Sequence, residues 1–456
     1  MLNVIFWIVS IAAVVSAVYH IVVKKDLYGV STYILLGVYL PLFMSFLDWS
    51  YYHISDKGEV FYYIFILFGM IFFIFYLLSQ SRIMMTNLRF SIKKRKRRMP
   101  VGIYNLIYIA CVLIENYYIS GTIFPNLFGM DVHTLRMPYI YFITTGIYIL
   151  SLLNILEFFC TKKKRYLLYL VMSLLINVVT KSARVDAFIC VVQIVSLCSF
   201  YYLSKRNLIK ERDKIKQKKK KRWPAIILLG CLMAGIITYS LDVGNDRMNK
   251  FGLYSMRYED GIGYQGPEFI GEVLPYYYGY FALSFDNLAY NTQQQESTHN
   301  YLGLNTFRTL YFGILQFDNL LGLTGSEATQ ENVIRCSGAA VATGFWDMYY
   351  DYGILIFVPF IISFAIYVFL RKKVTKPRVQ LLALAVYFYW VPIWMFLSFD
   401  NRLYDYQVLW HIIIMALLLR NRYEMEYDEI SGLEAEKNPV APSFKNRKRL
   451  GASVYF

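Results

Sequence analysis

Long apolar runs recur along most of this 456-residue chain, each close to the length of a membrane-crossing helix. A bilayer core of about 30 Å requires roughly 20 apolar residues in a helix. Runs of this kind lie at 2–23, 28–47, 59–79, 101–121, 138–159, 166–180, 185–203, 224–241, 353–370, 378–398 and 406–419. The pattern predicts an all-α, polytopic integral membrane protein with about eleven transmembrane helices, within a range of roughly 10 to 13.

Composition supports this class and excludes several others. Hydrophobic residues make up 57% and charged residues 17% of the chain, with a mean hydropathy of +0.39. Soluble domains carry about 45–50% apolar and about 25% charged residues. The composition therefore argues against a set of soluble domains, and against a disordered or collagen-like chain. Six cysteines without a CxxC pair and five scattered histidines indicate neither a disulfide framework nor a metal site, so no metal or cofactor is expected.

The net charge of +16 could indicate a nucleic-acid partner or a membrane, and the positions of the basic residues decide between them. Of the 47 lysines and arginines, 37 lie in 24–25, 82–98, 162–165, 205–222, 371–378 and 420–456. These segments follow every second predicted span or form the tail. Positive residues favour the cytoplasmic face. We therefore expect an N-terminus outside, a cytoplasmic C-terminus and no nucleic-acid partner.

This topology divides the chain into four parts. They are eight helices within 1–241 with basic cytoplasmic loops at 82–98 and 204–223, an extracytoplasmic loop at 242–352, three helices within 353–419, and a cytoplasmic tail at 420–456. The large loop is rich in tyrosine and phenylalanine, whereas disordered segments are poor in aromatic residues. Its segments 270–288 and 302–323 are predicted to be helices that lie at or re-enter the interface, although both together could also span.

The loop 242–352 combines a few arginines with many tyrosines and carboxylates. Arginine presents a planar fork of donors that fits phosphate oxygens. Tyrosine rings can pack on the C–H faces of sugars, but tyrosines also form the aromatic belts of membrane interfaces. The first interpretation suits a lipid-linked phosphate that carries a glycan, and the second requires no ligand.

Polar positions beside two predicted spans are candidates for chemistry. On a helix, Asp347 and Asp351 would lie one turn apart at about 5–6 Å, so that one carboxylate could take a raised pKa and act as a base. Alternatively, both stabilise the N-terminus of the helix at 353–370. Arg184 lies between two spans on the side where basic residues are scarce. It could bind a pyrophosphate group, or it could reach lipid headgroups or pair with Asp186.

Four short elements resemble those of the bacterial polysaccharide repeat-unit polymerases of the Wzy type, which build O-antigen or capsule. Such polymerases have many spans and one dominant outer loop. The elements here are Ser182-Ala183-Arg184; Tyr276-Tyr277-Tyr278-Gly279-Tyr280 with Ser284, Asp286 and Asn287; Gly303-Leu304-Asn305-Thr306-Phe307; and Thr343 with Tyr349, Tyr350, Asp351, Tyr352 and Gly353. An asparagine of the last family element is replaced here by Val341 or a neighbour.

The resemblance implies glycosyl transfer on the outer face of the bacterial cytoplasmic membrane, in a multi-span architecture like that of other lipid-linked-sugar glycosyltransferases. An undecaprenyl-pyrophosphate-linked oligosaccharide would be the donor. A sugar hydroxyl of a second lipid-linked unit would attack its anomeric carbon, and undecaprenyl pyrophosphate would leave. The expected partners are these lipid-linked substrates and membrane lipids, together with a flippase and a chain-length regulator.

For that reaction the chain offers three groups of candidate residues. Fixed positive charge stabilises a leaving pyrophosphate, and a carboxylate can take the proton of the acceptor hydroxyl. The candidates for pyrophosphate binding are Arg184, Arg257, Arg308 and Arg402. The candidate bases are Asp351 and Asp347, followed by Asp286. The candidates for glycan binding are Tyr277, Tyr278, Tyr280, Asn305 and Tyr350.

Three alternative functions remain to be weighed, namely a ligase, a flippase and a scaffold. An O-antigen-type ligase also has many spans, a large outer loop and arginine contacts to a lipid pyrophosphate. A lipid-linked oligosaccharide flippase would be expected to show internal repeats and broken helices near the midplane, and no repeat is visible in the sequence. A scaffold without chemistry would leave the aromatic loop unexplained.

Overall fold

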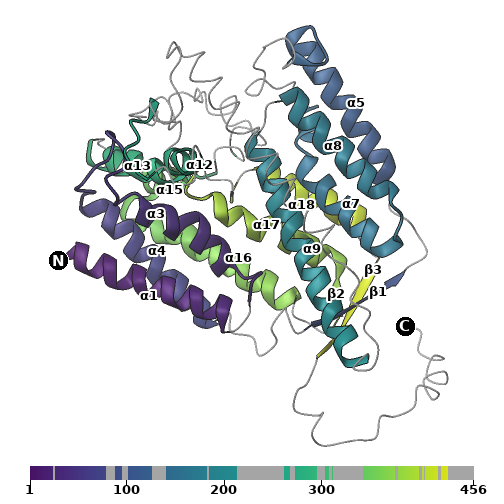
Figure 1. Cartoon of the computed structure of the whole chain (residues 1–456), viewed down its shortest axis with the longest axis horizontal. Helices are drawn as coiled ribbons and strands as arrows, with labels where there is room; N and C mark the ends of the chain where they lie inside the picture. Colours follow the sequence, from purple (N-terminus) through teal and green to yellow (C-terminus); the bar gives the residue numbers. More distant parts are fainter. Residues whose placement is uncertain are drawn as a thin grey trace, which may run out of the picture.

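The computed structural model describes residues 1–23, 26–78, 88–94, 101–125, 140–181, 184–212, 261–267, 273–294, 303–307, 311, 343–374, 378–399, 403–404, 406–419 and 423–429. Within them the fold is predominantly helical, as predicted (Figure 1). Four helices are long and apolar enough to cross a membrane. They are α1 (Leu2–Val22), α4 (Glu59–Leu78), α5 (Val101–Ser120) and the helical stretch Gly344–Val374, which a backbone kink at Gly353 divides.

Six shorter apolar helices accompany them, and each coincides with a predicted run. They are formed by α2 (Val30–Ile34) with η1 (Leu35–Tyr39) and α3 (Leu40–Met44); α7 (Ile147–Thr161), preceded by α6 (Tyr141–Thr144); α8 (Arg165–Lys181); α9 (Arg184–Arg212); α17 (Leu381–Trp390) with η7 (Val391–Phe396); and α18 (Tyr406–Leu419). The predicted run 224–241 lies outside the described residues. Helix α9 continues to Arg212, beyond the predicted end at 203, so part of the basic loop 204–223 is helical.

Irregular turns interrupt two of these helices where they pack together. Residues 35–39 form a π-helical turn, and 391–396 form a 3-10 helix that begins beside Pro392. A Cβ atom at Gly37 would clash with the backbone of Met395, including its carbonyl oxygen. Glycine at this position therefore allows the backbone of η1 to approach η7 directly.

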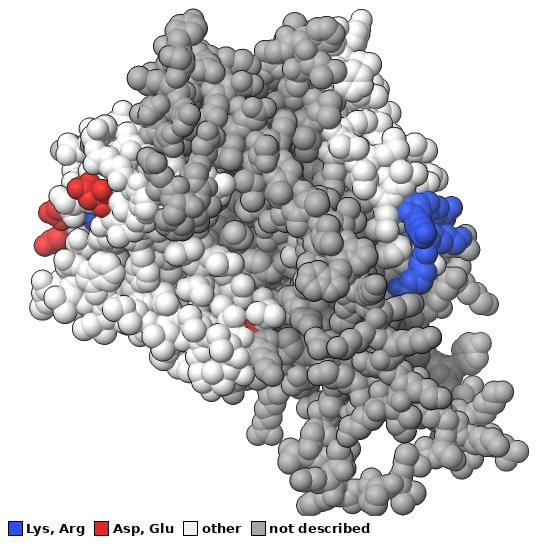
Figure 2. Space-filling view, viewed as in Figure 1, with Lys and Arg blue, Asp and Glu red and all other residues white. Residues whose placement is uncertain are grey.

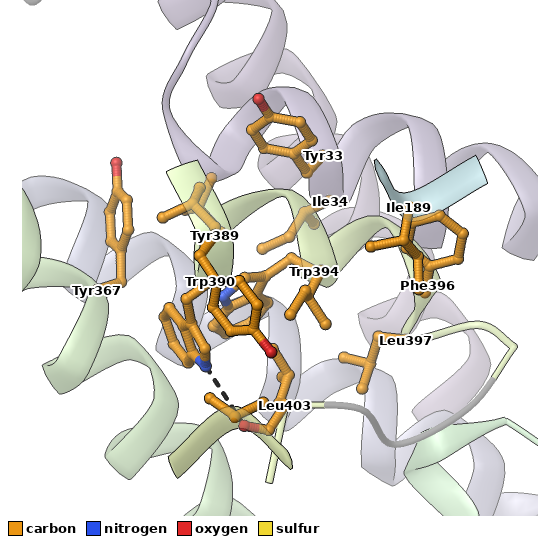
Figure 3. Packing of buried hydrophobic residues seen from close by; sticks show 14 of the residues in the cluster. Tyr33, Ile34, Ile189, Tyr367, Tyr389, Trp390, Trp394, Phe396, Leu397 and Leu403 are labelled. Atoms are coloured by element: carbon orange, nitrogen blue, oxygen red, sulfur yellow. Dashed lines mark hydrogen bonds between the residues drawn. The ribbon is translucent and has the colours of Figure 1, made fainter. Parts of the chain in front are cut away.

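Aromatic side chains fill the centre of the bundle (Figure 3). Trp390 and Trp394 are buried, with their ring centroids 5.7 Å apart at 89°, and the indole of Trp390 donates to the carbonyl oxygen of Leu403 at 3.3 Å. Nearby, the hydroxyl of Tyr33 donates to Ser196 at 2.6 Å. Buried indole and hydroxyl groups usually require such partners, so these bonds fix how the helices meet.

A buried amide network joins α5, α7 and α8. The side chains of Asn105 and Asn154 exchange hydrogen bonds of 3.0 and 3.1 Å, and Ser173 donates to Asn105 at 2.8 Å. Polar groups of this kind hold helices together where lipid provides little driving force for association. Three runs that are separate in the sequence thus form one packed unit.

One end of the bundle carries a three-stranded antiparallel sheet that the sequence did not predict. Its order is β1 (Leu88–Lys94), β3 (Tyr423–Glu429), β2 (Arg378–Gln380). The register places Arg89 opposite Asp428 and Lys93 opposite Glu424. β1 and β3 lie in the predicted cytoplasmic segments 82–98 and 420–456, and β2 begins at Arg378, the last residue of the predicted cytoplasmic segment 371–378. The sheet therefore brings these three segments to one end of the described structure.

An ion pair ties two further segments together beside the sheet. Arg371, in the last turn of α16 (Phe357–Val374), contacts Asp26 at 2.7 Å, and both side chains are buried. Asp26 follows α1, and His20 of α1 lies 4.0 Å from the same carboxylate. The loop after α1 and the segment after α16 were both predicted to be cytoplasmic, so this contact agrees with their placement on one side.

Candidate active site

The predicted carboxylates gather at the opposite end of the bundle, on α13 (Leu283–Gln294) and α15 (Gly344–Tyr352) (Figure 1). Phe285 of α13 and Phe345 of α15 have ring centroids 6.5 Å apart, and Phe65 of α4 contacts both at 5.5 and 4.9 Å. The helix α12 (Val273–Tyr277) and the π-turn η4 (Tyr278–Ala282) precede α13. We call this region, with the segment 45–58, the carboxylate end.

Asp347 and Asp351 both belong to α15, so they lie one helical turn apart. The Asp351 carboxylate is fully buried and accepts hydrogen bonds from the backbone N–H of Asn305 at 3.0 Å, from its side-chain amide at 2.9 Å, and from the N–H of Thr306 at 2.5 Å. The Thr306 hydroxyl donates to the Asp347 carbonyl oxygen at 3.4 Å. Asp351 therefore anchors the turn 303–307 on α15, whereas the Asp347 side chain is half-buried.

Gly303 opens this turn with a φ of +73°, a backbone conformation that glycine adopts without strain. The turn brings Asn305 and Thr306 onto Asp351 across 45 or 46 positions of sequence. Two of the elements that resemble the polymerase family, Gly303–Phe307 and Thr343–Gly353, are thus in direct contact. Asn305, predicted to bind glycan, directs its amide to Asp351 here.

Asp286 forms a buried ion pair with Lys57, which sequence reasoning did not select. Lys57 is 0% and Asp286 1% exposed, with 2.5 Å between Nζ and Oδ1. The ammonium also donates to the Ser45 carbonyl oxygen at 2.8 Å, and Ile54 N–H donates to Asp286 at 2.8 Å. Because an unpaired buried charge is very costly, each group makes the burial of the other tolerable. This pair fixes α13 to the segment 45–58.

His53 completes the group around Asp286. Its Nδ1 atom is buried 3.5 Å from Asp286 Oδ1, and the side chain as a whole is 11% exposed. Among the described residues His53 Nδ1 has no hydrogen-bond partner, and the imidazole lies beside the Asp286 carboxylate. An imidazole can exchange a proton near neutral pH, so His53 is a further candidate base at this end. The signal that could have found this group is Lys57, an isolated cation on the side where basic residues are scarce.

The predicted tyrosines differ in how much of each ring is accessible. Tyr278 is fully buried and donates to the Leu47 carbonyl oxygen at 2.9 Å, while burial raises the pKa of its phenol and keeps it protonated. Tyr277 donates to the Leu36 carbonyl oxygen at 3.0 Å. Tyr277, Tyr280 and Tyr350 are half-buried and keep surface that a sugar could contact.

We expect Tyr278→Phe to lower the free energy of unfolding by about 1 kcal/mol, because the substitution leaves the Leu47 carbonyl without its donor. Denaturant titration in detergent micelles measures this difference. Tyr51, whose side chain is 76% exposed at the same end, provides the control, and Tyr51→Phe should leave the unfolding midpoint unchanged. Equal midpoints for both variants would contradict the structural role of the Tyr278 hydroxyl.

The predicted arginines are only partly placed. Arg257, Arg308 and Arg402 lie outside the described residues. Arg184 is the first residue of α9, which runs from there toward the end that carries the sheet (Figure 1). Two residues along, the Asp186 carboxylate accepts a hydrogen bond from the Tyr148 hydroxyl of α7. Asp186 thus has a partner on another helix, independently of Arg184.

Comparison of the chain with family models, with curated proteins and with solved structures finds no match. The resemblance described above therefore rests on the residues themselves and on where the structure places them.

Proposed function

We propose that this protein is a membrane glycosyltransferase that polymerises undecaprenyl-pyrophosphate-linked oligosaccharide repeat units on the outer face of the bacterial cytoplasmic membrane. One observation supports this most strongly. Asp351 holds the turn 303–307, so two elements that resemble those of the polymerases form one structural unit. The tyrosine-rich element at 276–280 leads directly into α13, which lies against α15 at the same end.

The proposed membrane arrangement has eleven spans, with the carboxylate end facing outward. Its support is the charge pattern, together with the gathering of three predicted cytoplasmic segments in one sheet. Exposed Asp48, Asp56 and Glu59 lie at the carboxylate end, whereas the exposed basic residues Lys162 to Arg165 lie in the turn between α7 and α8. Figure 2 shows acidic and basic side chains at opposite edges of the molecule. Basic residues favour the cytoplasmic face.

In the proposed reaction, each side chain is given a role that fits its charge and its accessibility. Arg184, with Arg257, Arg308 and Arg402, would stabilise the charge that develops on the leaving pyrophosphate. Asp347 or His53 would take the proton of the acceptor hydroxyl, since each has a side chain that is only partly buried. Asp351 and the Lys57–Asp286 pair would position the loop, and Tyr277, Tyr280 and Tyr350 would contact the glycan.

Deletion of the gene, followed by gel analysis of surface polysaccharide, tests this proposal in the cell. A polymerase predicts single repeat units at the surface and no ladder of longer chains. Ligase function predicts finished chains that remain on their lipid carrier. Flippase function predicts loss of all surface repeats with units retained inside. Either of the last two results would contradict the proposal.

A further inference from the structure

A groove of about 560 Å³ lies beside the turn between α7 and α8, at the edge where Figure 2 shows the basic side chains. Its lining comes from the last turn of α7, from the connecting turn and from the first two turns of α8. The lining residues are Phe158, Lys162, Lys164, Leu167, Leu168 and Val171. The lining thus contains two cations and four apolar side chains, with no carboxylate among them.

The apolar part of the groove forms a continuous stripe along α8. Lys164, Leu167, Leu168 and Val171 follow the spacing that places side chains on one helical face. Leu168 is 57% and Val171 47% exposed in the part of the chain that the structure describes. A cationic end followed by an exposed apolar stripe matches the headgroup and the acyl chain of a lipid.

Lys162 is held in a defined position at the mouth of this groove. It ends α7 with a left-handed backbone, at a φ of 59°. Its ammonium donates to the Tyr201 hydroxyl at 2.5 Å and lies 4.7 Å from the centre of that ring. It also lies 5.7 Å from the ring centre of Phe159. These contacts orient the charge while the residue remains exposed.

We propose that this groove binds an anionic glycerophospholipid of the bilayer. Its phosphate lies between Lys162 and Lys164, and one acyl chain lies along Leu167, Leu168 and Val171. Lys163 and Arg165 add two exposed positive charges beside the mouth, so the site favours a net negative headgroup over a zwitterionic one. The site is independent of the chemistry at the carboxylate end.

Native mass spectrometry of the full chain, purified in a neutral detergent, tests this site. Dioleoyl phosphatidylglycerol is the anionic probe, and dioleoyl phosphatidylcholine is the neutral probe with the same acyl chains. We expect phosphatidylglycerol to be retained in preference. We expect Lys162→Gln/Lys164→Gln to weaken its binding by roughly 10- to 30-fold, because each basic residue near an anionic headgroup contributes a factor of about five.

Lys372→Gln/Lys373→Gln is the matched control, since it removes two exposed lysines from the last turn of α16. This variant should bind phosphatidylglycerol as the wild type does. Equal losses of binding in both double variants would show that binding depends only on general surface charge, which would contradict the proposal. Leu168→Trp fills the stripe while keeping both lysines, and it should also weaken binding. Unchanged binding in Leu168→Trp, or equal retention of the two lipids by the wild type, would overturn the proposal. Lys162→Arg/Lys164→Arg should preserve binding, which keeps the test decisive if the glutamine variant does not fold.

Discussion

Lys57→Met is expected to destabilise the protein by roughly 3 to 5 kcal/mol, because it leaves the Asp286 carboxylate buried without its cation. The same substitution removes the donor from the Ser45 carbonyl oxygen. Denaturant titration in detergent micelles measures the loss in the free energy of unfolding. Since the pair joins α13 to the segment 45–58, polymer formation should fall together with the free energy of unfolding.

The double variant Lys57→Met/Asp286→Leu separates the pair from the loss of a single charge. Removing both ions eliminates the buried unpaired carboxylate, so the double variant should recover much of the stability that the single variant loses. Ile54 N–H and the Ser45 carbonyl remain without these partners, so recovery should be incomplete. A single variant that unfolds within about 1 kcal/mol of the wild type would show that the pair does not stabilise this end.

Arg184→Ala is expected to lower the rate of polymer formation by roughly 100-fold or more, because loss of a preorganised charge at a leaving group costs about this much in rate. The amount of protein in the membrane should stay normal. Polymer length on a gel and protein level by immunoblot are the two measurements. Arg184→Lys keeps the charge but loses the planar fork, so it should retain an intermediate activity.

Two further variants distinguish binding of pyrophosphate from a local structural role. Lys181→Ala removes the other cation at the junction of α8 and α9 and should leave the ladder intact. Asp186→Asn removes the negative charge that accepts the Tyr148 hydroxyl. If Arg184 served only to pair with Asp186, Arg184→Ala and Asp186→Asn would have equal effects on the ladder. A normal ladder in Arg184→Ala would contradict the assignment to the pyrophosphate.

The helices of this fold could be predicted because each depends on a property of its own segment. A run of apolar residues near the length of a bilayer forms a helix whatever surrounds it, so the runs at 59–79 and 406–419 end within a residue or two of α4 and α18. The sheet could not be predicted in the same way. Its strand β1 is separated from β2 and β3 by most of the chain, and β3 lies in the tail. Their pairing depends on how the helices bring the segments together.

At the carboxylate end, the sequence likewise indicated which residues matter but not which partners they contact. The sequence singled out 303–307 and 343–353 as two elements of the large loop, and the structure places them in contact, although 304–307 form a turn where a helix over 302–323 was predicted. It did not predict that Asp351 would be buried among N–H donors, because donors on the backbone carry no signal in the sequence. Lys57 could not be paired with Asp286 from the sequence, since the two residues lie 229 positions apart.

The most direct test of the central proposal uses the purified protein in lipid vesicles. Undecaprenyl-pyrophosphate-linked repeat units are added without a nucleotide sugar, with EDTA present, and the products are resolved on a gel. We predict a ladder of chains with successive numbers of repeat units, unchanged by EDTA, together with release of undecaprenyl pyrophosphate. Repeat units that remain single while the protein is folded, or that lengthen only when Mg²⁺ is restored, would contradict the proposed reaction.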